Sequence, residues 1–235
     1  MNRLYRKCKE KDFTPQHVTE VGVYLPESSN IIDFARQGIR TTLVEAHPTY
    51  IAQIEAYFQN NPHVSLHPVA IADTPGQLNI VARGASTFVE HIAHSPSVVN
   101  DAYQLDQDDV ITVPAERFDR IDDGSIDLLS IDIEGSEWYV IKHLKSRPVV
   151  ISVETHGKLY INPFLAEITS WMQANGYRIW YKDKSDTVYL KHSTLPISWL
   201  DKGKLFARNA SLALRRRKVK AKRFFRSLLG YHPFW

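Results

Sequence analysis

The sequence predicts an α/β protein built on a doubly wound, mostly parallel sheet. Strand-like and helix-like segments alternate along most of its 235 residues, which is typical of sheets covered by helices on both faces. The segment 149–154 is mostly apolar and β-branched, as in parallel strands buried on both faces. Two final strand-like segments, 177–181 and 187–190, predict an antiparallel hairpin at one edge.

The expected elements follow in a simple order. Strands are expected at 18–24, 41–45, 64–71, 78–81, 110–114, 126–133 and 149–154, and helices at 31–37, 48–59, 136–144 and 164–174. Gly38 suits the end of the first helix, because glycine adopts the left-handed backbone that closes helices. Pro48 is tolerated in the first turn of the second helix. A turn at Pro75-Gly76 precedes strand 78–81, an added hairpin strand.

Charge divides the chain into unequal parts. Residues 202–235 contain 11 Lys and Arg and no Asp or Glu, whereas the other residues contain 18 basic and 26 acidic side chains. We therefore expect a basic N-terminal segment at 1–17, an α/β domain at 18–195 and a basic helical tail at 196–235.

The tail interleaves apolar and basic side chains, which suits an anionic membrane surface or a nucleic-acid backbone. The bulky pairs Phe224-Phe225, Leu228-Leu229 and Phe234-Trp235 favour the membrane, and nucleic acid is the less favoured partner. The alternative is a solvated helix that packs its apolar face on the domain.

Composition also indicates a compartment. Cys8 is the single cysteine, which excludes an internal disulfide and a cysteine-based metal cluster. No stretch is long and apolar enough to span a bilayer, and residues 1–11 lack the apolar region of a secretory signal. We expect a cytoplasmic protein, peripheral at the inner membrane face if the tail binds lipid.

Acidic residues stand at the ends of four expected strands. They are Glu20, Glu45, Asp132 with Glu134, and Glu154. In open α/β sheets ligands bind at the carboxyl ends of the strands, so we expect a site there. Glu45 has a specific use, because an acid ending the second strand can accept hydrogen bonds from a nucleoside ribose. The alternative is a solvated loop acid before His47-Pro48.

The segment 132–137 places three carboxylates directly after an apolar run. Because like charges repel, we expect them to hold a cation, a proton or a polyol. The alternative is an acidic helix start, in which Ser136 caps and Glu137 occupies the first turn. That alternative does not explain Asp132 or Glu134, which precede the cap.

His156 is distinguished from the other histidines because it follows a buried strand and lies near Glu154. A histidine and carboxylates at adjacent strand ends could deprotonate a hydroxyl or hold a divalent cation. We favour the base, so a metal is compatible with these residues but is not expected.

Residues 84–109 form a polar stretch without a clear period. Loops of that length are usually functional lids or disordered. We expect a lid over the cleft, with Ser86, Thr87 and Glu90 as its polar contacts.

Four segments, in this order and spacing, resemble the FkbM-type family of S-adenosylmethionine-dependent methyltransferases. They are LVEAHP at 43–48, PVAIAD at 68–73 with Gly76, Val113-Pro114 with Phe118-Asp119, and residues 126–138, where DIEGSEW at 132–138 is the most specific. The resemblance covers about residues 18–191. It implies a Rossmann-like doubly wound fold, S-adenosylmethionine as cofactor, and O-methyl transfer to a hydroxyl, often on a sugar or polyketide.

On this interpretation, two groups of residues form the site. The cofactor would contact Glu20, Gly22, Tyr24, Glu45, Ala46, Ala70 and Asp132. The acceptor would be oriented or deprotonated by Asp132, Glu134, Glu154 and His156. We expect the acceptor to be a sugar, glycan or glycolipid intermediate.

One turn departs from the family pattern. The family reads Asp-Val-Gly-Ala-Asn-x-Gly, whereas this chain reads EVGVYLP at 20–26, with Tyr24 in the asparagine place and Pro26 in the second glycine place. Two alternatives therefore stand beside the enzyme: a non-catalytic binding module with a methyltransferase fold, and an RNA methyltransferase that uses the basic tail.

Overall fold

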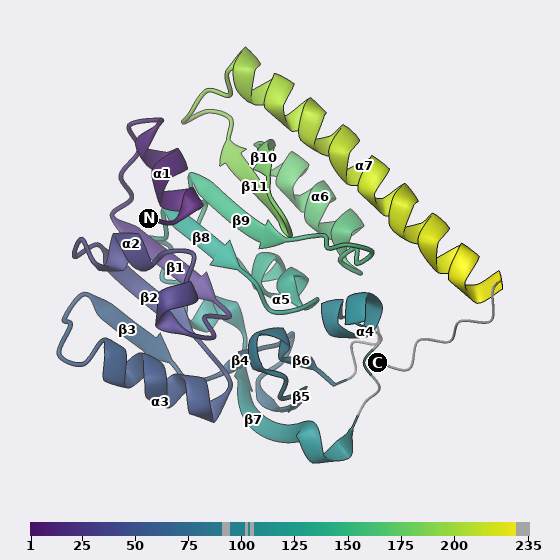
Figure 1. Ribbon diagram of the computed structural model, residues 1–235. Coiled ribbons are helices and arrows are strands. Elements are labelled where there is room, and N and C mark those ends of the chain that lie inside the picture. The colour runs from purple at the N-terminus through teal and green to yellow at the C-terminus, as the bar shows by residue number, and fades with distance from the viewer. Residues whose placement is uncertain (91–94, 102, 104–105, 229–235) are drawn as a thin grey trace.

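The computed structural model describes residues 1–90, 95–101, 103 and 106–228 (Figure 1). A seven-stranded sheet in the order β10-β11-β9-β8-β1-β2-β3 forms its centre. Its strands are β1 (His17–Val21), β2 (Arg40–Val44), β3 (Val64–His67), β8 (Leu128–Ile131), β9 (Val150–Glu154), β10 (Tyr177–Lys182) and β11 (Asp186–Lys191).

The five strands from β9 to β3 in that order are parallel. Strand β11 runs antiparallel to β9, and β10 runs antiparallel to β11. The prediction of a mostly parallel sheet with an antiparallel hairpin at one edge is confirmed.

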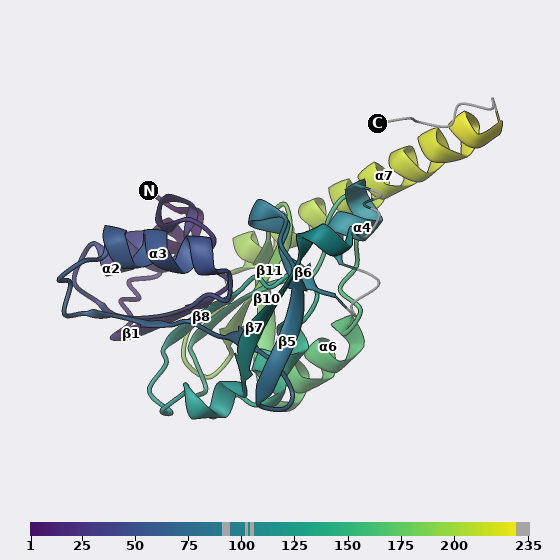
Figure 2. The ribbon, with the colours of Figure 1, turned by 90° about the horizontal axis from the view of Figure 1, so that it is seen from below.

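Helices cover both faces of this sheet (Figure 2). On one face α5 (Glu137–Lys142) and α6 (Leu165–Ala174) bury Val140, Ile141 and Ile168 against the sheet. On the other, α1 (Arg3–Lys9), α2 (Ile32–Ala35) and α3 (Pro48–Tyr57) bury apolar side chains such as Leu4 and Ile54. The segment 1–17, expected as a basic extension, therefore contributes to the core.

A second, four-stranded sheet was not expected. Its order is β4-β7-β5-β6, formed by β4 (Ala70–Ile71), β7 (Val110–Glu116), β5 (Gly76–Val81) and β6 (Phe88–Val89). The single strand predicted at 64–71 is wrong, since β3 and β4 belong to different sheets. Pro68 lies between them and has no N–H for a sheet ladder, which explains the break.

The stretch 84–109 holds more structure than a loop. Besides β6 it contains the short 3-10 helices η2 (Gly84–Ser86) and η3 (Gln107–Asp109) and the helix α4 (Pro96–Asp101). Residues 91–94, 102 and 104–105 of the expected lid lie outside the described residues. Two further 3-10 turns, η1 (Pro26–Ser28) and η4 (Phe118–Arg120), follow β1 and β7.

The tail forms the long helix α7 (Trp199–Leu228). It packs across β10, where Leu212 is buried and the Arg208 guanidinium donates a hydrogen bond to the Asp183 carbonyl. Its C-terminal part extends beyond the sheet (Figures 1 and 2). The predicted helical tail is confirmed.

Candidate functional site

The strand order reverses between β1 and β8. The chain moves outward through β2 and β3 on one side of β1, then returns to β8 and β9 on the other side. A crevice is expected outside the carboxyl ends of the strands at such a point. A cavity of about 580 Å³ lies there, lined by the loops after β1, β2 and β8, by the second sheet and by the β10–β11 turn.

Every residue expected to contact a cofactor lines this cavity. They are Glu20, Gly22, Tyr24, Glu45, Ala46, Ala70 and Asp132. This placement comes from strand ends that meet at one edge of the sheet. Their roles toward a ligand stay predictions.

Gly22 lets the ends of β1 and β8 approach closely. Its φ is +84°, and a Cβ atom at this position would lie 1.9 Å from the Asp132 carbonyl oxygen. The glycine was expected to contact the cofactor. The structure shows that the missing side chain makes room for the neighbouring strand end.

Glu45 ties two loops together. Its Oε2 accepts hydrogen bonds from the backbone N–H groups of Val23 (3.1 Å) and Tyr24 (3.0 Å). Its Oε1 accepts from those of Ala46 (2.9 Å) and His47 (2.8 Å). The carboxylate therefore organises the loop after β1 as well as its own, although Tyr24 and Pro26 replace the expected asparagine and glycine.

Tyr24 occupies the left-handed region, with a φ of +58°. Its ring packs edge-on against Tyr50, with centroids 4.6 Å apart, and both rings line the cavity. Non-glycine residues adopt this backbone at a cost. The hydrogen bond from its N–H to Glu45 helps hold it there.

Glu20 is buried below this loop. Its carboxylate accepts hydrogen bonds from the Ser29 hydroxyl and from the Asn30 N–H at 2.8 Å. Burial raises the pKa of Glu20 to about 7 despite these donors. Its proton is therefore exchanged near neutral pH.

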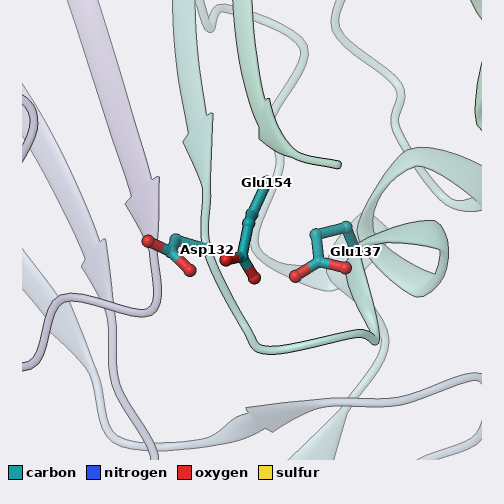
Figure 3. A group of neighbouring side chains, drawn as sticks. All are labelled: Asp132, Glu137 and Glu154. Carbon is teal, nitrogen blue, oxygen red and sulfur yellow. The ribbon is translucent and has the colours of Figure 1, made fainter. Parts of the chain in front are cut away.

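Three carboxylates form a compact group (Figure 3), and one of them, Asp132, lines the cavity. Oxygens of Asp132, Glu137 and Glu154 all lie within 4.8 Å of one another. Burial, followed by the charge of Glu137, raises the pKa of Asp132 to about 7. Burial also raises the pKa of Glu137 to about 7 and that of Glu154 well above its usual range.

The loop between β8 and α5 positions the carboxylates that follow β8. Glu137 Oε1 accepts from the N–H groups of Ile133 (3.0 Å) and Gly135 (3.1 Å). Ser136 stands before α5, but its hydroxyl donates to the Ile133 carbonyl instead of capping the helix, so the alternative interpretation is wrong about this capping bond. Glu134 has a φ of +55° and lines the cavity, a backbone strain typical of functional loops.

His156 does not meet the acids at the cavity, so the expected convergence is wrong for this residue. Its Nε2 lies 3.3 Å from the Asp183 carbonyl oxygen and its Nδ1 lies 3.0 Å from the Thr155 hydroxyl. Burial lowers its pKa to about 4. Strand β9 ends at Glu154, and the bridge of His156 to Ile161 turns the chain away. Glu154 likewise does not line the cavity.

The expected lid contributes in part. Gly84, Thr87 and Phe88 line the cavity, whereas Ser86 and Glu90 do not. The Glu90 carboxylate instead accepts a hydrogen bond from the Asn79 side chain (3.0 Å) within the second sheet. Two of the three expected polar contacts are therefore wrong.

Several site residues were missed. Arg3 and the turn residues Asp183 and Asp186 line the cavity, and burial, followed by the charge of Asp183, raises the pKa of Asp186 to about 8. An acidic turn between the last strands was a usable signal, because the turn lies at the same sheet edge. Nothing local to Arg3 indicated its position.

Among the described residues, no helix combines the length and apolar character that crossing a bilayer requires. A family model of the methyltransferase FkbM domain matches residues 17–179. No curated protein matches the chain.

Solved structures are similar to this chain at low identity. Monomeric WbdD is 11% identical with a TM-score of 0.44, over 80% of this chain and 40% of that chain. Precorrin-6y C5,15-methyltransferase from Geobacter metallireducens GS-15 is 14% identical with a TM-score of 0.41, over 80% and 85%. Cofactor-bound Rv0187 from MTB is 13% identical with a TM-score of 0.43, over 80% and 78%.

The chain thus spans 40% of the length of WbdD. The family model, in contrast, covers most of this chain, and its matched range contains β1, β2, β8 and β9 with the loops that form the cavity floor. The protein therefore belongs to the FkbM family of methyltransferases.

Proposed function

We propose that the protein is an S-adenosylmethionine-dependent O-methyltransferase that acts on a hydroxyl of a sugar, glycan or glycolipid intermediate. The observation that carries this proposal is the acid-lined cavity at the switch point of the sheet. Among the described residues its acids are Glu20, Glu45, Asp132, Glu134, Asp183 and Asp186, against the two cations Arg3 and Lys184.

The chemistry of this lining fits the cofactor. S-adenosylmethionine supplies a methyl group on a positively charged sulfonium, which an acidic cavity attracts. Ala46, Val69 and Ala70 add apolar wall, and Tyr24 and Tyr50 add aromatic faces suited to a purine. A volume of about 580 Å³ lies within the usual range of small-molecule sites.

Glu45 stands where a ribose would be bound. Because its oxygens already accept four backbone hydrogen bonds, ribose hydroxyls would share or replace the N–H groups of Val23 and Tyr24. Cofactor binding is then coupled to the loop after β1, which is the loop that departs from the family pattern.

Asp132 and Glu134 are the carboxylates that would face the acceptor. They lie in the loop after the central strand β8 and line the cavity, so either can accept the hydrogen bond of an acceptor hydroxyl and receive its proton. Methyl transfer needs in-line approach of that oxygen, so positioning supplies much of the rate. Glu154 and His156 would act only through neighbouring groups, since neither lines the cavity.

Calorimetric titration of the full chain with S-adenosylmethionine and S-adenosylhomocysteine tests the cofactor. We expect both to bind, and Glu45→Ala to weaken binding by about 1–3 kcal/mol. Glu55→Ala, an exposed acid on α3, is the matched control and should leave affinity unchanged. If the intact chain binds neither ligand, the non-catalytic binding module replaces the enzyme.

The acceptor class requires a separate assay. Release of S-adenosylhomocysteine is measured with sugar, glycan and glycolipid acceptors that carry free hydroxyls, and with RNA. Turnover on a glycan that Asp132→Asn reduces supports the proposal. Turnover on RNA alone would favour the RNA methyltransferase.

We further propose that α7 places the enzyme on an anionic lipid surface. Trp199, Phe206 and Leu214 are 79%, 78% and 57% exposed. Their spacing of seven and eight residues puts them on one face of the helix, away from the Leu212 face buried on β10. Lys202 and Lys218 are exposed beside them. An apolar stripe with basic flanks suits the interface of a membrane.

Co-sedimentation with anionic and neutral vesicles tests this proposal. We expect binding to anionic vesicles that salt weakens, since each Lys or Arg near the surface adds about 1 kcal/mol. The double variant Phe206→Ser and Leu214→Ser should lose the salt-resistant part, whereas Ala210→Ser on the same face should not. Salt-dependent RNA binding without vesicle binding would reject the lipid partner.

A further inference from the structure

We propose that Asp132, Glu137 and Glu154 form a binding site for one hard divalent cation, of the Mg²⁺, Mn²⁺ or Ca²⁺ class. The site would lie behind the acceptor end of the cavity. Its existence does not depend on the identity of the acceptor. Only the role of the cation in catalysis rests on the proposed function.

The three side chains converge from separate elements. Asp132 directly follows β8, Glu137 begins α5, and Glu154 ends β9, and in Figure 3 the Glu154 carboxylate lies between those of Asp132 and Glu137. One oxygen from each lies within 4.8 Å of the others. Two oxygens that share one cation through bonds of about 2.4 Å lie no more than about 4.8 Å apart, so each pair of these carboxylates is close enough to share an ion.

Glu154 has one buried carboxylate oxygen that lacks a hydrogen-bond partner among the described residues. This oxygen is Oε2, and the side chain is 6% exposed. A buried carboxylate oxygen without a donor is costly unless a cation or a proton satisfies it. This oxygen belongs to the carboxylate that Figure 3 shows facing those of Asp132 and Glu137.

Three hydrogen-bond donors orient the Glu137 carboxylate. Two backbone N–H groups donate to its Oε1, and the Asn162 amide donates to its Oε2. Asn162 also donates to the Glu154 carbonyl oxygen at 3.2 Å, so one side chain orients two of the three ligand residues. Such supporting donors are typical around metal ligands.

The ligand set selects the class of ion. The group contains carboxylates and neither histidine nor cysteine, and oxygen ligands of this kind suit magnesium, calcium and manganese. Because Asp132 also lines the cavity, an ion beside it lies near the acceptor. An acceptor with neighbouring hydroxyls, such as a sugar, could supply further oxygen ligands.

Mn²⁺ titration of the chelator-treated full chain, read by the paramagnetic resonance signal of free Mn²⁺, tests the site. We expect one Mn²⁺ per chain, displaced by Mg²⁺ or Ca²⁺. Glu154→Gln should weaken Mn²⁺ binding at least tenfold, because an amide replaces a charged ligand. Asp186→Asn removes an equally buried acid outside the group and should change Mn²⁺ affinity less than threefold.

Thermal unfolding supplies a second readout that does not need activity. Mn²⁺ should raise the melting temperature of the wild-type chain but not that of Glu154→Gln, and circular dichroism checks that each variant is folded. If the folded wild-type chain binds no Mn²⁺ at millimolar concentration, the proposal is overturned and the group holds protons instead. Equal affinity in wild type and Glu154→Gln would overturn it as well.

Cofactor titration in chelator separates this inference from the proposed function. Mn²⁺ binding without S-adenosylmethionine binding would support the cation site and reject the methyl donor. The reverse result would reject the cation site alone.

Discussion

Glu45 and Glu154 both lie at the carboxyl ends of parallel strands of one sheet, yet their surroundings are opposite. The Glu45 carboxylate accepts four backbone hydrogen bonds and fixes two loops. Glu154 leaves one buried oxygen without a donor and lies against two further carboxylates. The comparison teaches that an acid at a strand end contributes to the fold where the backbone supplies donors. Where other acids surround it, its buried oxygen has no donor and is satisfied only by a cation or a proton.

The largest expected change in unfolding free energy comes from removing Glu45, the acid whose oxygens accept backbone hydrogen bonds. Glu45→Ala leaves four backbone N–H groups without their acceptor, so we expect a loss of roughly 2–4 kcal/mol of unfolding free energy. Urea denaturation measures this loss. Glu55→Ala, an exposed acid on the following helix, should stay within about 0.5 kcal/mol of wild type. A similarly small effect of Glu45→Ala would mean that the loops hold their shape without it.

Glu20 combines the two situations, because it has donors and is still buried. Its pKa is raised from 4.5 to about 7 by burial, so between these values the folded chain holds a proton that the unfolded chain has released. The stability that protonated Glu20 contributes is present below pH 4.5 and is lost as pH rises toward 7.

We expect Glu20 to lower the unfolding free energy by roughly 2–3 kcal/mol across that pH window. Urea denaturation between pH 5 and 8 measures the slope. Glu20→Gln cannot ionise and should flatten it. An unchanged slope in Glu20→Gln would show that other acids, such as Asp186, carry the dependence.

The sequence predicted these strand ends because the signal is local. Runs of apolar and β-branched residues end at acids, and parallel strands bring those ends to one edge whatever the details of their loops. Glu20, Glu45 and Asp132 were therefore placed at the cavity without a structure. Gly22 was also identified, although its contact with the Asp132 carbonyl depends on the pairing of β1 with β8.

Other features depended on contacts between distant residues. The second sheet pairs Ala70 with Ala115, and no short segment of sequence shows that pairing. Glu137 was expected to act with the neighbouring acids, and only folding brings Asn162 to its carboxylate. His156 was placed by its distance from Glu154 along the chain, but a turn after β9 sends its ring toward Asp183.

Glu154→Gln should act in the opposite direction from Glu45→Ala. In chelator it removes a buried negative charge from a group of three, so we expect a gain of about 1 kcal/mol in unfolding free energy. Urea denaturation at pH 8, where more of the acids are ionised, gives the clearest measurement. A loss of stability would show that the Glu154 charge has a compensating partner, and the contrast with Glu45 would then fail.

The smallest expected effect concerns Tyr24, whose backbone Glu45 holds. Tyr24→Asn introduces a residue that tolerates the left-handed region and relieves about 1 kcal/mol of strain. The same change removes the edge-on contact with Tyr50, worth about 0.5–1.5 kcal/mol. The two effects nearly cancel, so unfolding free energy in urea should change by less than about 1 kcal/mol.

Calorimetric affinity for S-adenosylhomocysteine should fall less than in Glu45→Ala, because the N–H at position 24 still reaches Glu45. A loss above about 2 kcal/mol of unfolding free energy would instead show that the tyrosine ring holds the loop in place. Glu45 would then no longer explain how a turn without the family's asparagine and second glycine keeps its shape.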